Sequence, residues 1–159
     1  MTSSRRCDEC GAPLAEVAAC REHFHALLAL EARIPGMAGA LPHFHAVASY
    51  QLQHPRGMGL TVAAYAGLLR VVADSVSGRT TLAEIRRRVR READGATPVR
   101  RRDGEPVPGG ATTEWPVTVA DVLAVEPVAS AYAEAVGRWA RSTLEVLDPG
   151  RLPPDTRPP

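Results

Sequence analysis

The sequence contains no lysine, and all 19 of its basic residues are arginine. Eighteen acidic residues balance them to a formal net charge of +1, which argues against whole-molecule attraction to nucleic acid or membranes. Charged partners must therefore be sought in local patches. The arginine bias itself says little about function, because genome composition produces it as readily as phosphate recognition does.

Long hydrophobic runs are also missing. No stretch approaches the roughly 20 apolar residues needed to span a bilayer, and the first residues, MTSSRR, lead into a polar cysteine motif rather than an apolar segment. We therefore expect a cytoplasmic protein with no membrane partner. The 159 residues, 45% hydrophobic and 23% charged, are typical of one globular domain that can bury a core without a metal or disulfide.

Cysteine is scarce, with three residues, and an odd number in a reducing compartment is unsuited to disulfides. Metal binding, thiol chemistry and plain burial remain, and spacing must choose among them. Cys7 and Cys10 flank two residues and precede Gly11, which is the spacing of a zinc knuckle: a tight turn directs both sulfurs at one ion.

Apolar periodicity, capping residues and proline positions predict helices, and no strand or hairpin signal is evident. The fold class predicted is all-α: one bundle-like domain of five or six helices over residues 1–148, with an N-terminal CxxC knuckle packed on a helical hairpin. Glycine and proline predict a flexible internal loop over 94–114, and a disordered tail follows over 149–159. The expected helices cover residues 14–33, 43–54, 60–77 and 81–93, a short stretch opened by Thr118 and Asp121, and residues 127–147, where Val128, Tyr132, Val136, Trp139 and Leu147 belong to the buried stripe.

Two further ligands would complete a tetrahedral site, and six downstream cysteine and histidine residues are candidates. If the first two helices form an antiparallel hairpin about Met37, residues equally far from Met37 lie opposite each other. Cys20 and His54 are such a pair, at the open end of the hairpin where the knuckle enters. The geometry thus nominates Cys7, Cys10, Cys20 and His54, a set for which Zn²⁺ is the default metal.

Other interpretations of these residues remain open. Cys20 and His23, three residues apart on one helix, could bind the metal locally, and a buried structural thiol is the alternative role for Cys20. The CxxC pair could be a redox switch, although no strand precedes it. His25 and His45 are more typical of surface or partly packed histidines than of ligands.

A second polar site is predicted at the closed end of the hairpin. His43 and Glu31 are equally far from Met37, so an imidazole and carboxylate pair is the expected arrangement. Near the metal site, Asp121 is a candidate acceptor for the other ring nitrogen of a metal-bound histidine, although an ordinary role at the start of a helix is the competing interpretation. Tyr50 is either a core residue or an acid or base.

Four motifs occur in a fixed order: CxxCG, a lone helical cysteine, H(x6)YxxQHP and WPxTxADV. Together they resemble an uncharacterised bacterial family known only as a domain of unknown function, over most of the chain from Cys7 to Leu147. The resemblance implies a small metal-binding protein and brings no established reaction. Its pattern falls on Cys7, Cys10, Cys20, His43, Tyr50, Gln53, His54, Pro55, Thr118, Asp121 and Trp139, whereas Arg21 and a short Cys10 to Cys20 spacing depart from it.

Three classes of function are compatible with these features. A zinc ion with four protein ligands would be structural, leaving a domain that binds some protein partner. An open fourth position would instead permit a zinc-dependent enzyme, although no motif such as HExxH is present. Eight arginines between residues 86 and 102 raise nucleic-acid binding, which we do not favour because aromatic residues that would stack on bases are missing there.

Overall fold

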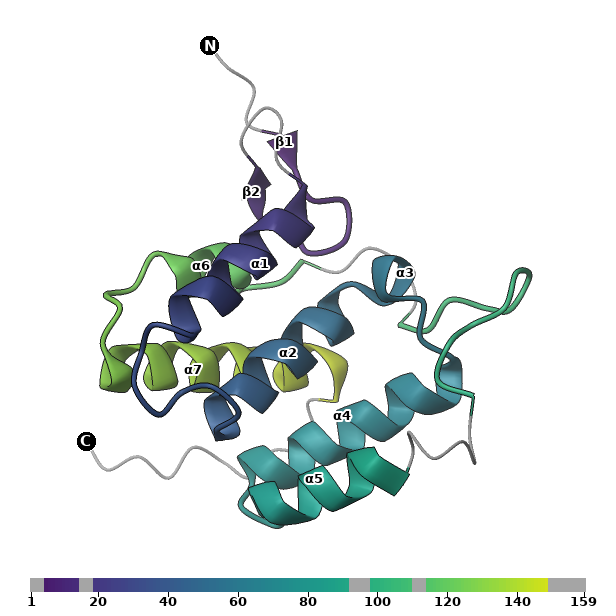
Figure 1. Cartoon of the computed structure of the whole chain (residues 1–159). Helices are drawn as coiled ribbons and strands as arrows, with labels where there is room; N and C mark the ends of the chain where they lie inside the picture. The colour runs from purple at the N-terminus through teal and green to yellow at the C-terminus, as the bar shows by residue number, and fades with distance from the viewer. Residues whose placement is uncertain (1–4, 15–18, 92–97, 110–113, 149–159) are drawn as a thin grey trace.

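The computed structural model describes residues 5–14, 19–91, 98–109 and 114–148 (Figure 1). This part of the chain is predominantly helical, as the sequence predicts, and its one sheet has two very short strands. In chain order the elements are β1 (Arg5–Arg6), β2 (Pro13–Leu14), α1 (Cys20–Glu31), α2 (Leu41–Gln53), α3 (Pro55–Met58), α4 (Val62–Val76), α5 (Leu82–Arg91), α6 (Val119–Leu123) and α7 (Ala129–Leu147).

The core forms around α2 and α7, which lie against each other along much of their lengths (Figure 1). One cluster of buried side chains lies beneath α1 and α6 and includes Tyr132 and Trp139, neither of which is exposed. A second cluster joins α2, α4 and α7 and includes Leu52 and Val72. Burying side chains of this size stabilises the fold by about 2 kcal/mol each.

Helix starts follow the predicted chemistry. Pro42 lies in the first turn of α2, and the Thr61 hydroxyl accepts from the Ala64 amide at the start of α4. Before α5, the Glu84 carboxylate accepts from the Thr81 amide at 2.7 Å, which confirms the capping box read from the sequence.

The N-terminal region differs from prediction. The helix expected over 14–33 begins at Cys20, because Leu14 pairs with Arg5 in an antiparallel β1–β2 hairpin; residues 15–18 lie outside the described part. The expectation that no strand forms was wrong. Strands of two residues are too short to show the alternation of apolar and polar residues by which a strand is recognised in a sequence. Two backbone hydrogen bonds of 2.9 Å set the register of the hairpin: the Cys7 amide donates to the Ala12 carbonyl, and the Gly11 amide donates to the Cys7 carbonyl.

Two helix boundaries also need correction. Pro55, expected only to stop a helix, also opens the four-residue helix α3, since proline fits a first helical position. The last helix begins at Ala129 rather than residue 127, which leaves Val128 at its N-cap and 48% exposed instead of in the buried stripe. Both differences lie at turns of the chain. There, packing against the rest of the molecule decides where a helix begins, and the apolar periodicity of the sequence does not.

The segment predicted to be a loop runs past the start of α4. Leu60 and Arg100 form an isolated bridge, the Thr61 amide donates to the Val99 carbonyl at 3.0 Å, and the Arg101 amide donates to the Gly59 carbonyl at 2.8 Å. Its flexibility stays a prediction, and parts of it (94–97 and 110–113) and the tail lie outside the described residues. Among the helices the structure describes, none has the length and apolar character to cross a membrane.

Candidate metal centre

The β1–β2 hairpin carries Cys7 and Cys10 in the turn between its strands. Gly11 adopts a φ of +74°, which only glycine accepts readily, and this closes the turn directly after Cys10. The Arg6 guanidinium donates to the Gly11 carbonyl at 3.0 Å. Cys10 is fully buried and Cys7 is partly buried. The Cys7 sulfur faces His54, and the Cys10 sulfur faces Cys20.

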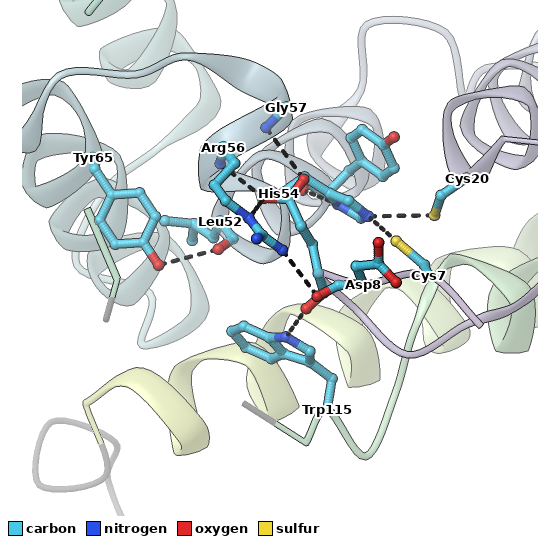
Figure 2. A network of polar contacts seen from close by, with 11 residues as sticks. Cys7, Asp8, Cys20, Leu52, His54, Arg56, Gly57, Tyr65 and Trp115 are labelled. Carbon is cyan, nitrogen blue, oxygen red and sulfur yellow. Dashed lines mark hydrogen bonds and ion pairs between the residues drawn. The ribbon is translucent and has the colours of Figure 1, made fainter. Parts of the chain in front are cut away.

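Helices α1 and α2 run antiparallel and bring the other two candidates to the same place (Figure 1). Cys20 is the first residue of α1 and His54 the C-cap of α2. The Cys20 sulfur lies 3.3 Å from His54 Nε2, and the Cys7 sulfur lies 3.6 Å from the same nitrogen (Figure 2). The hairpin about Met37 therefore places Cys20 beside His54 as the sequence predicts.

Four ligand atoms converge at this point. The sulfurs of Cys7, Cys10 and Cys20 and a ring nitrogen of His54 all lie within 4.8 Å of one another. The Cys10 and Cys20 sulfurs are 3.5 Å apart. A tetrahedral zinc with ordinary bond lengths would separate two sulfurs by about 3.8 Å and a sulfur from a nitrogen by about 3.6 Å. The cluster thus has the dimensions of a tetrahedral metal site, and its residues could hold a metal ion.

The imidazole of His54 is oriented from its other side. Its Nδ1 donates to the Tyr50 carbonyl one helical turn earlier, at 2.7 Å, which directs Nε2 at the sulfurs. The Tyr50 ring stacks on it with centroids 4.0 Å apart, and Phe24 of α1 stacks on the opposite face of Tyr50 at the same distance. Both rotation and tautomer of the ligand are therefore fixed before any ion binds.

Protons are shared unequally among these groups when no metal is present. Burial alone would lower the pKa of His54, but hydrogen bonds with Cys10 and Cys7 outweigh burial and raise it to about 10. Hydrogen bonds from Cys10, Cys20 and His54 lower the pKa of the Cys7 thiol, whereas contact with Cys10 and Cys7 and burial raise the pKa of Cys20. The cluster favours negative charge on Cys7, which a cation would neutralise.

The turn carrying the cysteines is held by contacts beyond the cluster (Figure 2). The Glu9 carboxylate accepts from the backbone amides of Arg56 at 2.7 Å and Gly57 at 3.1 Å, in the first turn of α3. The Arg56 guanidinium donates to the Asp8 carbonyl, and the Trp115 indole donates to the Glu9 carbonyl, both at 3.0 Å. Sequence reasoning missed the structural roles of Glu9 and Trp115; the only signal was their position inside the CxxC and WPxTxADV motifs.

Asp121 has the second of its two predicted roles, at the start of a helix, and not the role of acceptor for His54. Its carboxylate accepts from the Thr118 amide at 2.7 Å and the Thr118 hydroxyl at 2.9 Å, which caps α6. The Tyr50 carbonyl, not Asp121, takes the second ring nitrogen of His54. Asp121 still lines a cavity of about 780 Å³ beside Cys7 and Cys10. Tyr50 is 4% exposed, and burial together with the nearby cysteines raises the pKa of its phenol. It is therefore a core residue, and its ring stacks on those of Phe24 and His54.

The remaining histidines lie away from the cluster. His45 is buried, with its Nε2 2.8 Å from the Ser75 hydroxyl, and burial lowers its pKa to about 4. His25 is exposed, and His23 has a buried Nδ1 without a hydrogen bond among the described residues. The alternative in which Cys20 and His23 bind a metal from one helix is therefore not supported, because the Cys20 sulfur contacts the ring nitrogen of His54.

At the closed end of the hairpin the second predicted pair forms. His43 Nδ1 lies 2.5 Å from a carboxylate oxygen of Glu31, whose side chain is 3% exposed. The Tyr132 hydroxyl of α7 donates to the other oxygen at 2.6 Å. Glu31 therefore has a partner on each oxygen, which explains how a buried carboxylate is tolerated.

A small helical domain in which a cysteine turn and a helical hairpin bring three thiols and one imidazole together is the class that the fold and site define. The chain belongs to the family of unknown function DUF5946, whose model matches residues 5–148. That span includes all four converging residues and confirms the resemblance read from the motifs. No curated protein and no solved structure matches the chain.

Proposed function

We propose that the protein binds one Zn²⁺ through Cys7, Cys10, Cys20 and His54 and that the ion is structural. The observation that carries the proposal is the convergence of four ligand atoms within 4.8 Å of one another. Three thiolates and one imidazole are ligands that zinc prefers, and four protein ligands would close the coordination sphere.

The position of the cluster supports a structural role. Its ligands come from three places that are distant in sequence: the turn of the β1–β2 hairpin, the first residue of α1 and the end of α2. A hairpin with two residues in each strand has no stability of its own. An ion bound at this point would join the hairpin to both helices, so its binding energy would also be folding energy.

Metal analysis of the purified protein tests the proposal. We expect one equivalent of zinc in the native protein, and loss of that zinc in both Cys7→Ser and His54→Ala. His25→Ala, which removes an exposed histidine outside the cluster, is the matched control and should retain one equivalent. Full zinc retention by His54→Ala would overturn the assignment of the fourth ligand.

A second candidate function follows from the exposure of Cys7. This ligand lines two cavities, of about 400 Å³ and 780 Å³. If Cys7 left the ion, water or substrate could take its place, and the site would become that of a zinc enzyme. X-ray absorption of the zinc-loaded protein separates the two functions: three sulfurs and one nitrogen support a structural ion, whereas a bound oxygen ligand supports an open position.

A further inference from the structure

A third cavity, which no cysteine lines, lies between α2, α4 and α5. Its volume is about 550 Å³, within the range of small-molecule sites. Most of its lining is apolar, including Phe44, Val47, Leu68, Leu82, Ile85 and Val89. The cavity is partly open to solvent, because Arg86, Val89 and Arg90 of its lining are exposed.

Helix α5 is only lightly attached over this cavity. Of its ten residues only Ile85 is buried, and Val89 is 55% exposed although it lines the cavity. A specific polar contact holds the helix in place: the Arg86 guanidinium donates to the Gly39 carbonyl at 2.5 Å, in the connection before α2. The helix is thus positioned by its polar contact while its apolar stripe remains underpacked.

The charged side chains at the cavity are two arginines. Arg86, Arg90 and His43 line it, and no acidic side chain of the described residues does so. Arg90 forms no ion pair or hydrogen bond with any residue in the described ranges. An apolar cavity edged by two guanidinium groups is complementary to a molecule that has an apolar body and an anionic end.

His43 adds an oriented group to this edge. Its Nδ1 is engaged by the buried Glu31, which Tyr132 holds from the other side, so Nε2 is the ring atom left for a ligand. The side chain is 39% exposed. The nearby Arg86 contact with Gly39 makes the start of α2 the polar end of the cavity, and Phe44, Val47 and Leu68 provide the apolar part.

We propose that this cavity binds a single-chain carboxylate of the fatty-acid class, with its carboxylate at Arg86 and Arg90 and its alkyl chain between α2, α4 and α5. We favour a small ligand over a docked peptide helix because the volume of the cavity, about 550 Å³, lies within the range of small-molecule sites. The proposal is independent of the zinc site.

Isothermal titration of the full-length, zinc-loaded protein with dodecanoate, below its critical micelle concentration, tests the proposal. We expect saturable binding of one dodecanoate, with dodecanol and dodecyltrimethylammonium binding at least about tenfold more weakly, since a charge-assisted contact is lost. Val47→Trp, which fills the apolar part, and Arg90→Glu, which reverses a charge at the edge of the cavity, should each weaken binding by about tenfold or more. Arg88→Glu is the matched control, because Arg88 is exposed on the same helix but does not line the cavity.

Circular dichroism and zinc content establish that each variant is folded. Arg90→Glu alters an exposed residue, so it decides the result even if Val47→Trp fails to fold. Absence of dodecanoate binding, equal binding of dodecanol, or equal weakening by Arg88→Glu and Arg90→Glu would overturn the proposal. So would binding of an acidic amphipathic peptide by a protein that does not bind dodecanoate.

Discussion

His45 shows how one buried side chain sets a pH dependence. Burial lowers its folded-state pKa from the ordinary 6.5 to about 4, and the Ser75 hydroxyl is its hydrogen-bond partner. Between these two values the unfolded chain binds a proton that the folded chain does not. The free energy of unfolding should therefore fall as the pH falls through this window, by on the order of 3 kcal/mol in total.

Urea unfolding of the native protein and His45→Gln between pH 7 and pH 4 measures this contribution. We expect the difference in pH slope between the two to correspond to about one proton. Contributions from the metal site are common to both proteins and cancel in the difference. Identical slopes for the native protein and His45→Gln would contradict the prediction.

Glu31 illustrates the cost of removing one partner from a buried charge. Tyr132→Phe would remove the hydroxyl that donates to one carboxylate oxygen of Glu31, leaving that oxygen buried without a donor. We expect the free energy of unfolding to decrease by about 1–3 kcal/mol.

Tyr65→Phe is the matched control, because the Tyr65 hydroxyl donates at 3.0 Å to the neutral Leu52 carbonyl. Removing a donor from a neutral acceptor should destabilise by about 1 kcal/mol. Urea unfolding of both variants gives the comparison, and a Tyr132→Phe effect no larger than that of Tyr65→Phe would show that the Glu31 charge is not sensitive to its partner.

Among the elements, the α1–α2 hairpin was the most predictable. Cys20 meets His54, Phe24 meets Tyr50 and Glu31 meets His43, and the members of each pair are equally far from Met37. Helical periodicity and the proline and glycine between the helices were sufficient to place these contacts. Pairing by symmetry works because the connection is short and the two helices are antiparallel.

The contacts that surround the cysteine turn could not be predicted in the same way. Glu9 reaches the amides of α3, a helix of four residues that has no periodicity to detect, and Trp115 comes from a segment more than a hundred residues later. Asp121 was only a candidate partner of His54 Nδ1, beside an ordinary role at the start of a helix, and it caps α6. The partner is the Tyr50 carbonyl one turn earlier, a kind of acceptor that is available in any helix. Such contacts depend on the tertiary path.

Glu9→Gln tests whether the link between the cysteine turn and α3 contributes to metal retention. The variant keeps the size of the side chain but loses the charge that the amides of Arg56 and Gly57 contact. We expect zinc to transfer to a chelator several-fold faster than from the native protein, because charge-assisted hydrogen bonds are stronger than neutral ones. Glu22→Gln, in the exposed first turn of α1, should leave the rate unchanged. Equal rates for the native protein and Glu9→Gln would show that the link does not restrain the site.

At the scale of the whole molecule, the two core clusters should differ in their response to removal of the proposed zinc ion. Cys10 and Cys20 belong to the cluster beneath α1 and α6, whereas the cluster joining α2, α4 and α7 contains no residue of the metal site. Chelation should therefore loosen the β1–β2 hairpin and the start of α1 and leave the second cluster packed.

Hydrogen exchange read by mass spectrometry, with and without a chelator, measures this separation. Amides of the hairpin and the first turn of α1 should lose protection, while those in the centre of α4 and the last turns of α7, which are held by residues such as Val72 and Leu144, should keep most of theirs. His54→Ala should reproduce the pattern of the chelated native protein. Uniform loss of protection across all helices would mean that the ion stabilises one cooperative unit and that the second cluster cannot remain folded without it.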